Sequence, residues 1–131
     1  MLDCVILGDS IAVGTHQFKQ ECQLIGKSGI NSYQFNKTVN KSFSSNVVVI
    51  SLGSNDNIGI KTKLELTNLR SRISTNSKVY WILPSIKPDI QNIINEIAQH
   101  NGDIVLIATK LNKDGIHPSW ASYKELADNI K

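Results

Sequence analysis

Short runs of apolar residues recur along the chain, and most of them end at or near a residue that favours a turn. The four strongest runs are continuous rather than alternating, at residues 4–7, 47–50, 79–83 and 104–107. A weaker run at residues 23–25 ends at Gly26. Continuous runs rich in β-branched residues are typical of strands that are buried on both faces, as in a parallel sheet. The pattern therefore predicts five parallel strands.

Helical patterns lie between these runs, and the clearest of them begins at Pro88-Asp89. Proline suits the first turn of a helix, and an acidic residue is favourable there because of the helix dipole. Apolar residues then recur at helical spacing, and Asn101-Gly102 ends the pattern. The apolar positions of this helix are Ile90, Ile93, Ile94 and Ile97.

Two further helices are predicted with good end signals, and two with weaker ones. We interpret Thr62-Lys63-Leu64-Glu65 as a capping box, followed by Leu69 and Ile73 on the apolar face. The last helix begins at about Ser119. Its apolar face is formed by Trp120, Tyr123, Leu126 and Ile130. Residues 11–20 and 32–40 are the weaker candidates.

Alternating strands and helices predict an α/β fold, a three-layer α/β/α sandwich around a five-stranded parallel sheet. In such folds ligands bind outside the carboxyl ends of the strands. That rule directs attention to five loops, at residues 8–14, 26–33, 53–62, 84–89 and 108–118.

Length and composition narrow the class of protein. The chain has 131 residues, which predicts a single domain over residues 1–131. A net charge of +3 without a basic run does not favour nucleic-acid binding, and no apolar stretch is long enough to span a membrane. No signal peptide is visible at Met1-Leu2-Asp3. We therefore expect a cytoplasmic protein or part of a larger assembly such as a virion, although a processed secreted protein would look the same.

Two cysteines are too few for a disulfide framework, and their spacing is not that of a metal site. Cys4 and Cys22 are therefore expected to be buried apolar thiols. Trp81 and Trp120 are expected in the core. His16 and His100 are expected at the surface, without partners.

The first and last of the five loops contain residues that could catalyse a reaction. Gly8-Asp9-Ser10-Ile11 places a serine at a strand-to-helix turn, where its hydroxyl would lie at the sheet edge. Asp114-Gly115-Ile116-His117-Pro118 places a carboxylate three residues before a histidine. Such a carboxylate can bind the imidazole Nδ1–H and leave Nε2 free to act as a base. The alternatives are a helix cap at Asp9 or Ser10 and an exposed histidine in a turn.

Two other loops carry possible hydrogen-bond donors. Gly53-Ser54-Asn55-Asp56 contains an asparagine, whose side-chain amide can stabilise a developing oxyanion. The alternative is an Asx turn. Gly26-Lys27-Ser28-Gly29-Ile30 could bring a backbone N–H close to a ligand, although a plain tight turn explains this segment equally simply.

Together these four loops resemble the SGNH hydrolases, also called GDSL esterases and lipases, in a form of minimal length. The blocks occur in family order over nearly the whole chain, with Ile11 in place of the usual leucine. The resemblance implies Ser10 as nucleophile, His117 as general base and acid, and Asp114 as the group that orients His117. It implies an oxyanion hole formed by the N–H groups of Ser10 and Gly29 and the side chain of Asn55. It also implies a flavodoxin-like sheet of order 2-1-3-4-5 and no metal or organic cofactor.

The sequence thus predicts a serine ester hydrolase that forms an acyl-enzyme. Short loops favour a small acyl group, so the expected substrate is an acetylated carbohydrate or other small ester. The alternatives are a thioesterase or lysophospholipase of the same chemistry, and a non-catalytic binding domain on the same fold. Asp9 and Asp56 are expected to brace their own loops. Five lysines at the same sheet edge are expected to form an exposed cationic rim: Lys27, Lys61, Lys87, Lys110 and Lys113.

Overall fold

The computed structural model describes residues 3–131, in which strands and helices alternate along the chain. The strands are β1 (Cys4–Gly8), β2 (Gln23–Gly26), β3 (Val47–Ser51), β4 (Lys78–Ile82) and β5 (Ile104–Leu106). The helices are α1 (Ser10–His16), α2 (Ser32–Thr38), α3 (Thr62–Ser71), α4 (Pro88–Asn101) and α5 (Trp120–Asp128). All five predicted strands and all five predicted helices are therefore present.

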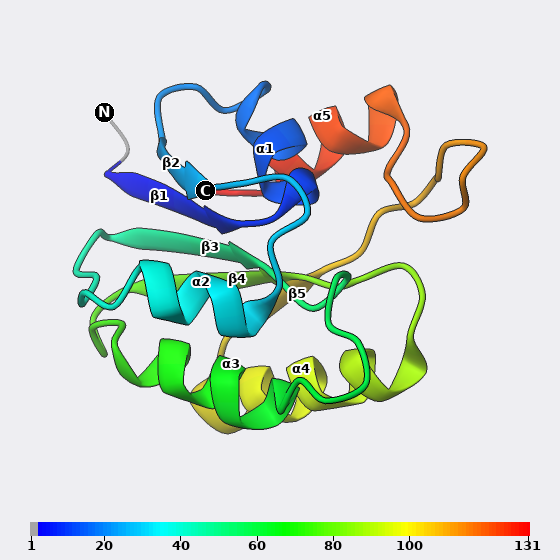
Figure 1. The fold of residues 1–131 in the computed structure, drawn as a ribbon. Coiled ribbons are helices and arrows are strands. Elements are labelled where there is room, and N and C mark those ends of the chain that lie inside the picture. The colour runs from blue at the N-terminus through cyan, green and yellow to red at the C-terminus, as the bar shows by residue number, and fades with distance from the viewer. Residues whose placement is uncertain (1–2) are drawn as a thin grey trace.

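The strands form one parallel sheet in the order β2-β1-β3-β4-β5. Helices α1 and α5 cover one face of this sheet, and α2, α3 and α4 cover the other (Figure 1). The three-layer sandwich and its strand order are confirmed. Because every strand runs in the same direction, every strand-to-helix loop begins at the same edge of the sheet.

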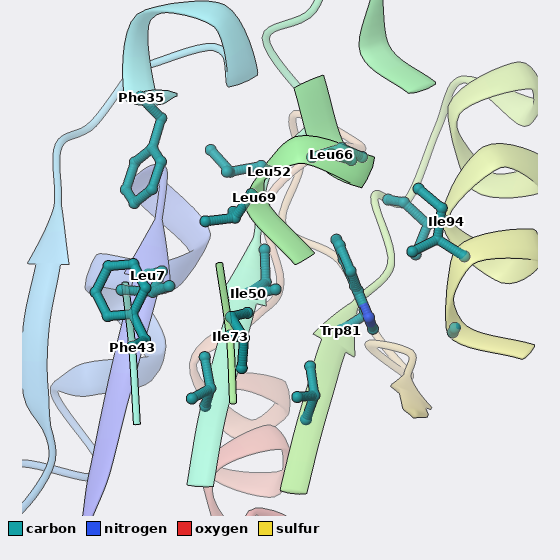
Figure 2. Packing of buried hydrophobic residues seen from close by; sticks show 14 of the residues in the cluster. Leu7, Phe35, Phe43, Ile50, Leu52, Leu66, Leu69, Ile73, Trp81 and Ile94 are labelled. Atoms are coloured by element: carbon teal, nitrogen blue, oxygen red, sulfur yellow. The ribbon is translucent and has the colours of Figure 1, made fainter. Parts of the chain in front are cut away.

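Alternate residues of the central strands enter different halves of the core. Leu7, Ile50 and Trp81 belong to the half that lies under α2, α3 and α4, together with helix residues such as Phe35 and Ile94 (Figure 2). Strand residues at the intervening positions, among them Ile6, Val49 and Tyr80, belong to the half under α1 and α5, which includes Ile11 and Leu126. Burial on both faces explains why these strands show continuous apolar runs rather than alternation.

Helix ends follow the sequence signals except at α3. Pro88 stands at the start of α4, Gly102 ends it in a left-handed conformation, and the Ser119 side chain caps α5. The capping box predicted at Thr62 is wrong, because Thr62 is already helical and its hydroxyl donates to Asp56 instead. In the described part of the chain, no helix is both long and apolar enough to cross a membrane.

The two tryptophans have different environments. Trp81 is fully buried, as predicted, and its indole N–H donates to Asp103, which is also paired with Arg70. The prediction for Trp120 is wrong, because its side chain is 71% exposed and packs edge-on against Phe18 with ring centroids 5.1 Å apart. Trp120 is the first residue of α5 and is not part of the core cluster that Tyr123 and Leu126 help to form.

The prediction of two free thiols is also wrong, because Cys4 and Cys22 form a disulfide. Both residues are buried, and their Cα atoms lie 4.7 Å apart. The bond ties the start of β1 to the residue before β2, and strand pairing places these two segments side by side. The prediction that His16 has no partner is wrong, because its Nε2 lies 2.9 Å from the Cys22 carbonyl oxygen. His100 is exposed, as predicted.

We predict that the disulfide stabilises the fold by about 3 kcal/mol, because it closes a loop of 18 residues in the unfolded chain. Urea unfolding with and without a thiol reductant measures this difference. A Cys4→Ala/Cys22→Ala variant should have the stability of the reduced protein and should not respond to the reductant. Equal midpoints for the wild type and this variant would contradict the prediction.

Candidate active site

Ser10 owes its position to the end of β1. Gly8 has φ +140°, and a Cβ atom there would lie 1.9 Å from the Ser51 carbonyl oxygen, so only glycine fits between β1 and β3. The chain then turns at Asp9, whose N–H donates to that same carbonyl at 3.0 Å. Ser10 follows as the first residue of α1, where a backbone N–H has no acceptor within the helix.

Asp9 caps α1 from inside the protein. Its Oδ1 accepts hydrogen bonds from the Ile11 N–H and the Ser51 hydroxyl, both at 3.0 Å. Its Oδ2 is buried and has no partner among the described residues. Burial raises the pKa of the Asp9 carboxyl to about 6, although these two hydrogen bonds oppose the shift. The prediction that Asp9 braces its own loop is confirmed.

The side chains of Ser10, His117 and Asp114 form a hydrogen-bonded chain. Ser10 Oγ lies 2.9 Å from His117 Nε2, and His117 Nδ1 lies 2.6 Å from Asp114 Oδ2. A carboxylate can only accept, so the proton is on Nδ1 and Nε2 is left to accept from the serine hydroxyl. The loop after β5 therefore brings a base to a residue 107 positions earlier in the sequence.

Asp114 is fixed by its own loop. Its Oδ1 accepts from the backbone N–H groups of Ile116 and His117, at 2.9 and 3.0 Å. The Ile116 N–H contributes most, and with the side chain and N–H of His117 it lowers the pKa of the Asp114 carboxyl to about 2. Asp114 therefore remains an anion through the neutral pH range and can hold the imidazole in one tautomer.

Helix α5 supports this loop and packs against α1. The Ser122 hydroxyl accepts from the Lys110 N–H at 2.9 Å. Tyr123 packs so closely on α1 that a Cβ atom at Gly14 would lie 2.5 Å from its ring. Burial, together with the negative charges of Asp9 and Asp114, raises the pKa of the Tyr123 phenol to about 12. The sequence pattern placed Tyr123 on the apolar face of the last helix and did not indicate that it lies near both carboxylates.

The loop that carries Asn55 is hydrogen-bonded to the turn that contains Gly29. Residues 27–30 form a turn, in which the Ile30 N–H donates to the Lys27 carbonyl and Gly29 takes φ +84°. A residue at that position of the turn needs a positive φ, which explains the glycine. The Asn55 side-chain amide donates to the Ile30 carbonyl at 3.0 Å.

Asp56 stabilises the loop that makes this Asn55–Ile30 hydrogen bond. Its buried carboxylate accepts from the N–H and hydroxyl of Ser32 and from the hydroxyl of Thr62. These bonds join the loop after β3 to the first turns of α2 and α3. The prediction that Asp56 braces its loop is confirmed, and the structure places Asn55 directly beside this brace.

A comparison with solved structures finds the same fold in another protein. That protein is described as a "putative GDSL-like lipase" from Bacteroides uniformis ATCC 8492, and the two structures match with a TM-score of 0.69. The match covers 97% of this chain and 92% of that chain at 15% sequence identity. At this identity the likeness shows the fold, which is the architecture that the sequence motifs implied.

No protein-family model and no curated protein matches the chain. What kind of protein this is must therefore be argued from its fold and from the serine, histidine and aspartate that meet at the carboxyl edge of the sheet. The roles of these residues are argued below from their geometry.

We predict that Asp9 makes the protein less stable as the pH rises. Its pKa is raised in the folded state from 3.8 to about 6, so the folded protein binds this proton more tightly than the unfolded chain does. Stability is then lost between about pH 4 and pH 6, and the shift corresponds to about 3 kcal/mol.

The measurement is urea unfolding of the wild type and of Asp9→Asn from pH 4 to pH 7. Asparagine keeps the Oδ1 acceptor but cannot ionise, so the difference in unfolding free energy between the two should change with pH in favour of the variant. Parallel pH profiles would show that Asp9 does not titrate in this range.

Proposed function

We propose that this protein is a serine ester hydrolase that forms an acyl-enzyme, with Ser10 as nucleophile, His117 as general base and acid, and Asp114 as the residue that orients His117. The observation that carries the proposal is the unbroken chain of hydrogen bonds from Ser10 Oγ through the imidazole to Asp114. A serine hydroxyl is a weak nucleophile until an adjacent base takes its proton, and this arrangement supplies that base.

In the first half-reaction Ser10 Oγ attacks the ester carbonyl carbon while His117 Nε2 takes the hydroxyl proton. The carbonyl oxygen becomes an oxyanion, for which the N–H groups of Ser10 and Gly29 and the amide of Asn55 are the proposed donors. The tetrahedral intermediate collapses, the bond to the alcohol oxygen breaks, and the imidazolium gives its proton to the leaving alcohol. The acyl group is then bound to Ser10.

In the second half-reaction a water molecule takes the place of the alcohol. His117 accepts a proton from the water as its oxygen attacks the acyl carbonyl, and the same donors stabilise the second oxyanion. Collapse releases the carboxylic acid and returns the proton to Ser10 Oγ. Asp114 remains ionised throughout because its pKa is about 2, so it stabilises the imidazolium in both steps.

The proposed substrate is an ester with a small acyl group, and an acetylated carbohydrate fits best. The side chains of His117 and Asp114 are 39% and 45% exposed, so the catalytic histidine lies in a shallow part of the surface that a bulky alcohol can reach. A thioesterase or lysophospholipase activity is favoured by one other feature. A hollow of about 660 Å³ beside Gly29 is lined partly by apolar side chains, including Ile25, Ile30 and Phe35, and could hold a longer chain.

We predict that a fluorophosphonate probe labels Ser10 in the folded protein, because the reagent reports a serine with both a base and an oxyanion site. Peptide mass mapping locates the adduct. Ser10→Ala should abolish labelling, whereas Ser44→Ala, which changes an exposed serine in the connection between α2 and β3, should not. An adduct at another serine, or none in folded protein, would contradict the proposed nucleophile.

We predict that kcat/KM falls as the acyl chain lengthens in a series of p-nitrophenyl esters from acetate to palmitate. A methylene that stays in water does not contribute the about 0.8 kcal/mol of binding that a buried methylene would. A longer acyl chain therefore adds bulk without added affinity. Acetylated sugars in the same assay test the carbohydrate preference. Faster turnover of decanoate than of acetate would instead favour the hollow beside Gly29 as an acyl site. Binding of the sugars without hydrolysis of any ester would support the non-catalytic alternative.

A further inference from the structure

Lys87 has an unusual backbone conformation at the end of the loop between β4 and α4. Its φ is 70° and its ψ is 76°, and no other non-glycine residue within the described range has a positive φ. This left-handed region is disfavoured for side chains with a Cβ atom. Such conformations persist where the surrounding contacts hold them, and they are concentrated at functional sites.

The Lys87 side chain turns inward and is half-buried, so it does not belong to the exposed rim that the sequence predicted. Its Nζ donates to the carbonyl oxygen of Ser54 and to that of Asp56, each at 2.8 Å. These two carbonyls lie on either side of Asn55 in the sequence. An ammonium group with three donors can bind both at once, and hydrogen bonds to a charged donor are stronger than those between neutral groups.

Asn55 is thus held from two directions. Its side-chain amide and the Asp56 carboxylate join it to the loop after β2 and to the first turns of α2 and α3. Lys87 holds the backbone on both sides of it from the loop after β4. Because Asn55 lies on a loop, its orientation depends on how firmly the peptide groups next to it are fixed.

We propose that Lys87 is a positioning residue that fixes the orientation of the Asn55 side chain, and so the geometry of the oxyanion hole. This inference rests on the proposed function for its catalytic consequence. Lys87 does not reach the reacting atoms in this proposal, since both of its bonds are to backbone carbonyls. Its effect passes through Asn55 alone, so removal of Asn55 removes the effect.

The test uses two variants of the full chain. Lys87→Met removes the ammonium group and keeps an unbranched side chain of similar reach. Lys87→Gly also removes the ammonium group, but glycine accepts φ 70° without strain, so this variant keeps the fold if the methionine variant does not. Lys37→Met is the matched control, because Lys37 is an exposed lysine in the last turn of α2 and carries the same charge.

Each of the two Lys87 variants is expected to lower kcat about tenfold with little change in KM, which is less than the 10²–10³ expected for loss of Asn55 itself. Lys37→Met should keep the wild-type kcat. In an Asn55→Ala background the Lys87 substitutions should have almost no further effect on kcat. Wild-type kcat in both Lys87 variants, or losses that multiply in the double variants, would overturn the inference.

A second readout does not depend on activity. The side-chain amide resonances of Asn55 in a ¹⁵N NMR spectrum should move toward those of an unstructured asparagine in Lys87→Gly, and should stay in place in Lys37→Met. If the wild type hydrolyses no ester but these resonances move, the positioning role stands and the proposed function fails. If the wild type is active and the resonances do not move, the proposed function stands and the positioning role fails.

Discussion

The parallel pairing of β1 with β3 is the constraint on which the whole site depends. Its register sets Gly8 opposite Ser51, and the neighbouring pair of β1 and β2 sets Gly8 opposite Gly26. Three strands therefore end at the same level, and their loops begin side by side. The approach is so close at Gly8 that a side chain there would collide with the Ser51 carbonyl. This geometry places the Ser10, Gly29 and Asn55 loops next to one another before any of their side chains interact.

Buried polar groups then fix each loop to its neighbour. Asp9 binds Ser51 of β3, Asp56 binds Ser32 and Thr62 at the starts of two helices, and Lys87 binds the carbonyls around Asn55. Each of these bonds joins a loop to another element of the fold. A buried polar group without a partner is costly, so loops braced in this way have few alternative conformations. Together these hydrogen bonds hold the loops at the carboxyl edge of the sheet in place without long insertions.

The surroundings of two carboxyl groups near Ser10 shift their pKa values in opposite directions. Asp9 is fully buried, and desolvation raises its pKa to about 6. Asp114 is exposed, and hydrogen bonds from its own loop lower its pKa to about 2. The acid beside the serine is therefore a structural cap that costs stability when it ionises. The acid beside the histidine remains an anion and is suited to stabilise a positive imidazolium.

The sequence by itself determined the order of elements, the parallel sheet and the residues that meet at its edge. Continuous apolar runs can only be strands buried on both faces or segments of buried helix, and their short length favours strands. The carboxyl ends of parallel strands share one edge, so Ser10 and His117 could be placed together although 107 positions separate them. Local signals at Pro88, Gly102 and Ser119 also sufficed for the helix ends, because capping involves residues close in sequence.

Only the tertiary structure decided which side chains find distant partners. Cys4 and Cys22 become a disulfide because strand pairing brings their Cα atoms to 4.7 Å, which their spacing along the chain does not reveal. Thr62 binds Asp56 rather than capping its own helix, and Lys87 turns inward to the Asn55 loop rather than outward to solvent. The sequence does not distinguish a polar side chain that faces water from one that binds a buried carbonyl group. The difference is set by where other loops pass, and that is a property of the folded chain.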